Sequence, residues 1–207
     1  MIKIDIFKKI GGRYGSVELK VNTAFKLHAV TQISGPSGIG KTTLLKILAG
    51  LILPDSGTVT VEDDVWFDQE EKFSKKVQDR CVGFVFQDFA LFPNMTVEEH
   101  LRYGTNDSRY INFLMELGEM KSLSDRFPKQ LSGGQQQRLA ILRALATKPD
   151  LLLMDEPFAA LDAELKSRLI NRLNSLFEEQ KTTVILVSHQ FNEFGEHNSH
   201  VFRLPNE

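Results

Sequence analysis

The feature that most constrains the fold is a glycine-rich loop followed by a lysine and two threonines. In order, the loop reads Gly35, Pro36, Ser37, Gly38, Ile39, Gly40, Lys41, Thr42 and Thr43. Its first eight residues fit the phosphate-binding pattern G-x-x-x-x-G-K-[ST] at every fixed position. An apolar run, residues 30–33, precedes the loop and a second, residues 44–48, follows it, so a short strand should lead through the loop into a helix. The sequence therefore predicts a site for a nucleoside triphosphate.

The chemistry of this loop follows from its residue types. Glycine adopts backbone angles closed to other residues, so Gly35, Gly38 and Gly40 let successive N–H groups turn inward on an anion. The helix that begins near Gly40 adds unpaired N–H groups and the positive end of its dipole. We expect Lys41 to reach the β- and γ-phosphates, in binding and in catalysis, and the Thr42 hydroxyl to ligate Mg²⁺. The alternative, a chance glycine-rich turn, is disfavoured by the flanking strand and helix.

Polar residues follow three further apolar strands. Gln87 ends the run 82–86, Asp155 and Glu156 follow 151–154, and Ser188 and His189 follow 182–187. Ligands of open parallel sheets bind outside the carboxyl ends of the strands, where the phosphate loop also lies. We therefore expect these residues to converge on the nucleotide.

The residue types suggest a role for each group. Asp155 can hold Mg²⁺, while Glu156 would orient and deprotonate the water that attacks the γ-phosphate. Gln87 could sense both the metal and that water, and His189 could bridge the γ-phosphate. Taken singly, each residue could be no more than a loop start or a solvated turn residue. Their joint spacing around a phosphate loop favours the catalytic interpretation.

The rest of the pattern defines the fold class. Alternation in 2–6 and 17–21 predicts an N-terminal β-hairpin, and a capping box at Thr96–Glu99 predicts a helix start. We expect an α/β fold: a P-loop NTPase core with a mixed, mainly parallel sheet, an N-terminal antiparallel β subdomain and an inserted α-helical subdomain at about 88–146. Residues 1–207 should form a single domain. Residues 63–80 are interpreted as a strand end plus loop, with Trp66 and Phe67 as the apolar anchor.

Composition limits the classes of partner. Lys and Arg number 25 against 27 Asp and Glu, a net charge of −2, which gives no electrostatic case for nucleic acid. The single cysteine, Cys81, excludes an internal disulfide and is expected in the core beside a strand. No stretch approaches the ~20 apolar residues of a membrane span, so any membrane part should come from another chain.

A further motif makes the family recognisable. Leu131-Ser132-Gly133-Gly134-Gln135 stands just upstream of the 151–155 strand and resembles the signature motif of the ATP-binding cassette (ABC) family. The other motifs follow in the family's order, including a D-loop at 159–162. The resemblance implies a head-to-tail homodimer in which Ser132, Gly133, Gly134 and Gln135 bind the γ-phosphate held by the partner. The alternative for these residues is a plain helix start. Family members also stack adenine on an aromatic residue of the first hairpin; Tyr14 is the first candidate and Phe7 the second, with an exposed turn residue as the alternative for Tyr14.

The resemblance also suggests a role. Residues 82–97 and 101–104 look like those of bacterial importer ATPases, closest to the molybdate type, with thiamine, sulfate and polyamine types near. This implies ATP and Mg²⁺, integral-membrane permease partners, an extracytoplasmic solute-binding protein and a place on the cytoplasmic face of the inner membrane. Importer ATPases often carry a regulatory domain after the cassette, which does not follow Glu207 here. A small exporter or lipoprotein-release type and a soluble non-transport ABC ATPase remain the alternatives.

Overall fold

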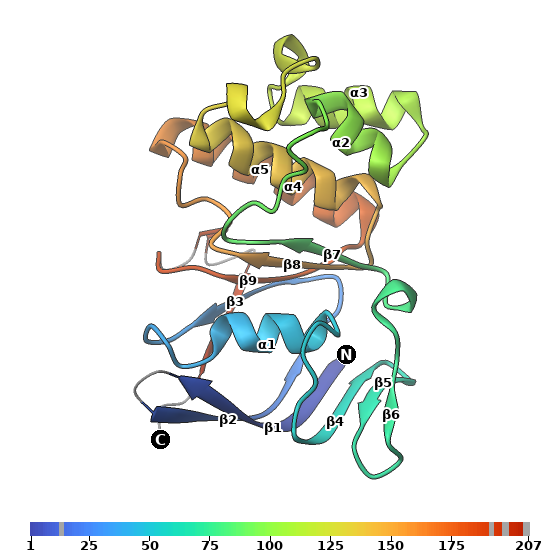
Figure 1. Cartoon of the computed structure of the whole chain (residues 1–207), viewed down its shortest axis with the longest axis vertical. Coiled ribbons are helices and arrows are strands. Elements are labelled where there is room, and N and C mark those ends of the chain that lie inside the picture. The colour runs from blue at the N-terminus through green and yellow to red at the C-terminus, as the bar shows by residue number, and fades with distance from the viewer. Residues whose placement is uncertain (13–14, 191–192, 196–198, 205–207) are drawn as a thin grey trace.

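Two sheets with one helix between them form the lower half of the molecule, and a layer of helices covers the upper face (Figure 1). The structure is a computed structural model that describes residues 1–12, 15–190, 193–195 and 199–204. It confirms the expected fold class, and in the described residues it sorts the antiparallel and the parallel strands into two separate sheets.

The antiparallel sheet has the strand order β2-β1-β4-β5-β6. Its strands are β1 (Ile2–Gly12), β2 (Gly15–Phe25), β4 (Ser56–Val61), β5 (Asp64–Asp68) and β6 (Phe73–Ser74). The predicted hairpin of β1 and β2 is confirmed, with Ile2 paired to Phe25. Alternation sets its faces, since Ile2, Ile4 and Ile6 are buried while the residues between them are not.

The parallel sheet has the order β10-β3-β9-β8-β7. Its strands are β3 (Val30–Ser34), β7 (Val82–Val85), β8 (Leu151–Asp155), β9 (Thr183–Val187) and β10 (Ser199–Arg203). Every residue of β8 and β9 is buried, as expected for central strands covered on both faces. β9 lies between β3 and β8, so the strand that enters the phosphate loop does not touch the strand that ends in Asp155.

The α-helices lie on both faces of this sheet. They are α1 (Lys41–Leu48), α2 (Val97–Gly104), α3 (Ser108–Leu117), α4 (Gly133–Ala146) and α5 (Ala163–Gln180). Short 3₁₀ turns occur at Val77–Asp79, Lys121–Leu123 and Pro128–Gln130. The capping box of Thr96 and Glu99 and the Asp162 cap of α5 are both present. The residues between β7 and β8 contain α2, α3 and α4, which is the helical insertion that the sequence predicts.

Side-chain alternation in the buried strands divides the core into two clusters. Leu151 and Leu153 pack toward α1 and the antiparallel sheet, whereas Leu152 and Met154 pack toward the helical layer. α1 is therefore enclosed between two sheets, and Leu44, Leu45 and Leu48 have no exposed surface. This burial fixes the helix that follows the phosphate loop.

Two sequence expectations outside the site were wrong. Residues 63–80 are not a plain loop, because they contain β5 and β6, and the buried Trp66 and Phe67 lie in β5. Cys81 is exposed rather than in the core, and its φ of 48° places it at a turn before β7. A two-residue strand and a left-handed turn leave little hydrophobic periodicity, so neither could be predicted from the pattern.

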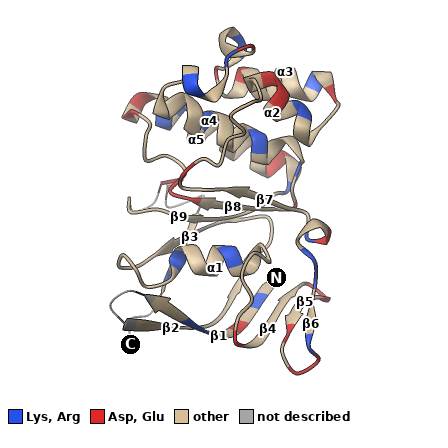
Figure 2. Ribbon diagram, in the orientation of Figure 1, with Lys and Arg blue, Asp and Glu red and all other residues tan. Residues whose placement is uncertain are grey.

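Charges are distributed by layer (Figure 2). The strands of the parallel sheet carry almost none, while both signs are interspersed over the helical layer. The acidic residues at the end of β8 are the exception, and they lie where the phosphate loop approaches.

Candidate nucleotide-binding site

The phosphate loop joins β3 to α1 and curls around the ammonium of its own lysine. Lys41 Nζ donates hydrogen bonds to the carbonyl oxygens of Gly35 at 2.7 Å and Pro36 at 2.9 Å. Lys41 is only 7% exposed. A buried ammonium needs such acceptors because desolvation disfavours its charge. The loop therefore holds a positive charge at the start of α1, where an anion would bind.

The N-terminus of α1 is left open to a ligand. Its N-cap residue is Gly40, with a φ of 107°, and no side chain caps the helix. The first N–H groups of a helix have no intrahelical partner. A Cβ at Gly40 would lie 3.0 Å from Ile10 Cδ1, so the close approach of β1 and the left-handed backbone both require glycine. Ile39, the residue before Gly40, packs against the core cluster that α1 forms with the antiparallel sheet.

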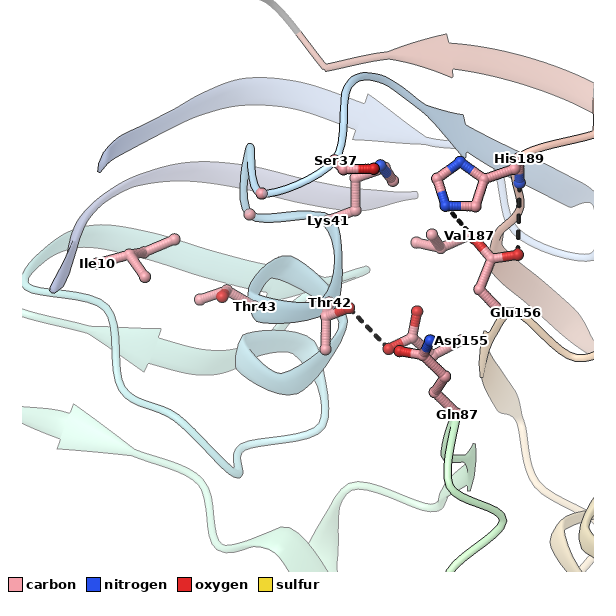
Figure 3. A pocket seen from close by; sticks show the side chains of 12 residues that line it. Ile10, Ser37, Lys41, Thr42, Thr43, Gln87, Asp155, Glu156, Val187 and His189 are labelled. Carbon is pink, nitrogen blue, oxygen red and sulfur yellow. Dashed lines mark hydrogen bonds and ion pairs between the residues drawn. The ribbon is translucent and has the colours of Figure 1, made fainter. Parts of the chain in front are cut away.

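A threonine and an aspartate meet at the foot of this loop. Thr42 Oγ1 donates to Asp155 Oδ2 at 2.7 Å, although the two residues are 113 positions apart (Figure 3). Asp155 is 3% exposed, and Gln87 lines the same pocket. A hydroxyl, a carboxylate and an amide oxygen form a donor set that suits Mg²⁺, which usually binds few protein ligands and completes its shell with water and phosphate oxygens. The residues present thus fit the metal expected from the sequence.

Glu156 faces His189 on the other side of the pocket (Figure 3). Glu156 Oε1 lies 3.5 Å from His189 Nε2, and Oε2 accepts from the His189 backbone N–H at 3.4 Å. Glu156 Oε1 is buried and accepts no hydrogen bond from the described residues. This oxygen faces the His189 ring and is shielded from solvent, so the carboxylate lacks one of the hydrogen bonds that an ionised carboxylate normally accepts.

Burial raises the pKa of Glu156, and the nearby Asp155 and Glu193 carboxylates raise it further, while His189 opposes the shift. Desolvation has this effect because it disfavours the charged carboxylate. A general base works best when its pKa lies closer to the operating pH than that of a free carboxylate does. The environment of Glu156 thus suits proton abstraction.

The backbone of Glu156 is also unusual. Its φ is 50°, in the left-handed region, which costs a non-glycine residue about 1–3 kcal/mol. Its N–H donates to the carbonyl of Val187 at 3.0 Å, which ties it to the end of β9. The turn directs the side chain into the pocket. If the extended strand continued through Glu156, the side chain would instead project from one face of the sheet.

These groups line one cavity of about 340 Å³. Its lining comprises Ile10, Ser37, Gly38, Gly40, Lys41, Thr42, Thr43, Gln87, Asp155, Glu156, Val187 and His189. The structure therefore brings together the phosphate loop and four of the five polar residues that were expected at strand ends. The fifth, Ser188, does not line the cavity, and its Oγ donates to Glu193 Oε1. Ile10 and Val187 were missed because each is an apolar residue in an alternating or continuous strand pattern, which carries no mark of a binding site.

The residues of the 131–135 motif lie elsewhere. In the described part of the chain, none of them lines this cavity. Ser132 is the N-cap of α4: its Oγ accepts from Gln135 N–H at 3.3 Å, and Gln135 Oε1 accepts from Ser132 N–H at 2.8 Å. Gly133 and Gly134 form the first turn, so the helix begins two residues later than Leu131. Ser132 and Gly133 are exposed, so the segment is a helix N-terminus on the surface, outside the nucleotide cavity of its own chain.

Of the two candidates for adenine stacking, only Phe7 lies within the described residues. Tyr14 falls outside the described residues. Phe7 occupies the face of β1 opposite to Ile6, and its ring meets Lys20 Nζ at 5.9 Å instead of lining the cavity. Among the described residues of the hairpin, Ile10 is the one that reaches the site.

A phosphate loop at the carboxyl edge of a parallel sheet, facing an aspartate and a glutamate at the end of a buried strand, defines a nucleoside triphosphatase of the P-loop class. The family model described as "ABC transporter" matches residues 19–159. The chain belongs to the ABC transporter family and is an ABC-type ATPase.

Curated relatives are similar over nearly the whole chain. A protein named "Probable sulfate/thiosulfate import ATP-binding protein CysA" from Chlorella vulgaris is 40% identical over 97% of this chain and 87% of its own. The molybdenum import ATP-binding protein ModC of Photorhabdus laumondii is also 40% identical, over 93% of this chain. The chain spans 54% of that relative, so it covers about half the length of the ModC protein.

Solved structures agree with this assignment. The ATP-binding cassette MJ0796, in a dimeric post-hydrolysis state bound to ADP and Pi, has a TM-score of 0.82 and 32% identity. The alignment covers 99% of this chain and 94% of that one. Of the helices in the described ranges, none combines the length and apolar character needed to cross a bilayer.

Proposed function

We propose that this chain is the ATP-hydrolysing subunit of an uptake transporter for a small oxyanion of the sulfate or molybdate type. The observation that carries the proposal is the cavity in which Lys41, Asp155, Glu156 and His189 meet. The oxyanion is supported by the names of the relatives, which include sulfate/thiosulfate and molybdenum import proteins. Both ions are small tetrahedral dianions, which fits the prediction of a molybdate-type importer.

Binding of ATP begins at the phosphate loop. The open amides at the start of α1 and the buried ammonium of Lys41 would hold the β- and γ-phosphates. Thr42, Asp155 and Gln87 would hold Mg²⁺, which supplies charge neutralisation when bound. The hydrogen bond between Thr42 and Asp155 keeps these oxygens together before the nucleotide arrives.

Hydrolysis then depends on the attacking water. Glu156, which lines the cavity, would accept a proton from this water through its carboxylate. His189, 3.5 Å away, would orient the carboxylate and contact the γ-phosphate. Because phosphoryl transfer depends chiefly on positioning and on stabilisation of charge, these residues would act by geometry more than by covalent chemistry.

The second anion site would come from another copy of the chain. The Ser132–Gln135 segment is exposed at the start of α4 and does not line the cavity of its own chain. A helix N-terminus is an anion site, and the solved cassette MJ0796 is dimeric with ADP and Pi. We therefore include in the proposal a head-to-tail homodimer that forms around ATP.

The remaining partners follow from the family. Residues 88–146, an insertion within one 1–207 unit, would receive the permease, and the complex would lie on the cytoplasmic face of the membrane with a solute-binding protein outside. The segment after Gln87 has features that suit contact with a partner. Arg143 donates to the Phe89 carbonyl and stacks on Phe92, and Tyr103 is 68% exposed. Such exposed aromatic residues are common in binding surfaces.

The test is reconstitution with permease subunits of the sulfate and of the molybdate type. In proteoliposomes with a sulfate- or molybdate-binding protein, ATPase activity should rise and radiolabelled sulfate or molybdate should enter. Export of a preloaded solute would support the exporter or lipoprotein-release alternative. Full ATPase turnover without any permease contact would support a soluble non-transport ATPase and contradict the proposal.

A further inference from the structure

Three consecutive glutamines at the start of α4 bind three different parts of the molecule. Gln135 closes the capping box with Ser132. Gln136 donates its side-chain amide to the carbonyls of Pro128 and Leu131, which braces the loop before the helix. Gln137, which the nucleotide site does not explain, is 2% exposed and points toward the end of β8.

Both polar atoms of the Gln137 side-chain amide are bonded to backbone groups. Its Nε2 donates to the carbonyl oxygen of Glu156 at 2.8 Å, and its Oε1 accepts from the N–H of Ala160 at 2.7 Å. A carbonyl can only accept and an N–H can only donate, so these partners fix the orientation of the amide. Leucine, similar in size, could make neither bond.

The backbone N–H and the backbone carbonyl of Glu156 are thereby both hydrogen-bonded. The N–H of Glu156 is bound by Val187 of β9, and its carbonyl is bound by Gln137 of α4. Between these bonds Glu156 has a left-handed φ of 50°. A strained conformation persists only where its surroundings over-determine it, and these two bonds restrain it together with a longer bond of 3.4 Å from the Ala159 N–H to the Glu156 carbonyl.

The same helix face contacts the D-loop. Gly134 lies one turn before Gln137, on the same side of α4. A Cβ on Gly134 would lie 3.0 Å from the carbonyl oxygen of Ala160. The exposed N-terminus of α4, which is the second proposed anion site, and the Gln137 amide therefore belong to the same part of the helix. This part of α4 contacts residues 156–161.

We propose that Gln137 is a positioning residue that fixes the Glu156 peptide, and through it the carboxylate, relative to the start of α4. This inference rests on the proposed catalytic role of Glu156. It has a consequence for the dimer. If an anion from the partner's nucleotide site draws the first turn of α4 toward itself, the Gln137 amide moves with that turn and carries the Glu156 peptide along. Occupancy of the second anion site would then set the position of the base.

The first test is Gln137→Leu in the full chain. A misplacement of about 1 Å can cost roughly 100-fold in rate, so kcat should fall about 10–100-fold. Affinity for ATP should stay within about twofold, because an interaction that acts on the reacting geometry lowers kcat rather than binding. Fluorescent-nucleotide titration and steady-state hydrolysis separate the two.

Tyr110→Phe is the matched control. Its hydroxyl is also buried and also bonded to α4, donating to the Leu145 carbonyl at 3.1 Å, but at the far end of the helix. It should lower thermal stability as Gln137→Leu does and leave kcat unchanged. Equal loss of kcat in both variants would assign Gln137 a general structural role and overturn the proposal.

A double-mutant cycle with Glu156→Gln tests whether Gln137 acts through Glu156. In the Glu156→Gln background, Gln137→Leu should lower the residual rate by no more than about twofold, because residues that act as a unit are not additive. Full additivity, or wild-type kcat in Gln137→Leu alone, would contradict the positioning role while leaving the proposed function intact. Wild-type hydrolysis by Glu156→Gln would instead contradict the proposed function itself.

Discussion

The molecule has two glycine-rich helix N-termini that suit anions, and they are built in opposite ways. At α1 the N-cap is Gly40, no side chain caps the helix, and a buried lysine adds positive charge. At α4 the N-cap is Ser132, and a complete capping box with Gln135 satisfies an N–H at each end of the first turn. The first terminus has no side-chain cap, whereas the second is partly capped by the side chains of Ser132 and Gln135.

This difference has a physical meaning. Uncapped amides at the start of a helix that is itself enclosed between two sheets can bind phosphate without rearrangement. At the capped terminus, a ligand that uses the Gln135 amide must displace its bond to Ser132, so the gain on binding is smaller. The α1 site should therefore set affinity for ATP in a single chain, and the α4 site should contribute only when a second chain brings it to a bound nucleotide.

The largest expected effect comes from Glu156→Gln. ATP would remain uncleaved in this variant, so the α1 terminus of one chain and the α4 terminus of its partner would stay bound to one γ-phosphate. General-base contributions are ~10²–10⁴-fold, so the ATPase rate should fall by about that range while ATP still binds. The variant should accumulate as an ATP-dependent dimer on size exclusion, with ADP giving a monomer. Near-normal hydrolysis would remove Glu156 from its catalytic role.

A second experiment separates the termini by affinity. Lys41→Ala removes a buried charge from the α1 site and should weaken ATP binding by roughly 30-fold or more. Lys46→Ala, in the last turn of the same helix, is the control and should bind normally. Ser132→Arg should abolish hydrolysis but leave binding by the single chain nearly intact, because Ser132 does not line that cavity.

Mixing these variants tests sharing across the dimer. A heterodimer of Ser132→Arg with Lys41→Ala retains one site in which both residues are wild type. Hydrolysis should reappear in the mixture, measured as phosphate release from purified heterodimer. A heterodimer with no activity would mean that each chain completes its own site.

A third experiment compares the caps. Gly40→Ala forces a side chain into a left-handed backbone and against Ile10, and should cost about 1–2 kcal/mol of unfolding free energy together with ATP affinity. Ser132→Ala should cost about 1 kcal/mol and leave ATP binding by the single chain unchanged. Asp107→Ala, which removes the cap of α3, is the matched control: similar loss of stability in urea, normal hydrolysis. A loss of ATP affinity in Ser132→Ala would erase the contrast between the termini.

The smallest effect concerns pH and the helical layer that carries α4. Burial lowers the pKa of His100, and Arg143 adds to this, whereas the Thr96 carbonyl and Glu99 oppose it. Its Nε2 accepts from the Phe92 N–H at 3.0 Å, so protonation would place two donors against each other. Since the unfolded chain takes up this proton more readily, the free energy of unfolding should decrease as pH falls below about 6.5.

His100→Gln, which cannot be protonated, isolates this contribution. The difference between wild type and variant should depend on pH between about 7.5 and 5 in urea denaturation, with wild type losing more stability at the acid end. The exchange of the Phe92 amide hydrogen should accelerate over the same range in the wild type. Parallel pH profiles for the two proteins would show that protonation of His100 does not cause the loss of stability at low pH.

Much of the site could be predicted because its parts are contiguous in sequence. The strand, loop and helix around Lys41 are one run of residues, and the polar groups after buried strands follow a general rule of parallel sheets. Local signals also predicted the capping box of Thr96 and Glu99 and the inserted helices. The roles assigned to Glu156, His189 and Ser132 remain predictions.

Other features depend on contacts between distant segments. No local signal places β9 between β3 and β8 or brings Ile10 to the phosphate loop. The hairpin of β5 and β6 was missed because strand pairing stabilises segments too short to have a period of their own. Gln137 reads as one more polar residue near a helix start until the fold places the Glu156 carbonyl and the Ala160 N–H beside it.

The sequence by itself determined the anion site at α1, the family and the residues able to perform the chemistry, because backbone conformation and residue type are local properties. Only the tertiary structure decided that Thr42 meets Asp155 across 113 positions, that Glu156 adopts a left-handed turn, and that the Ser132 segment lies outside its own chain's cavity. The physical reason is that packing of buried side chains and satisfaction of buried backbone groups are decided over the whole core at once.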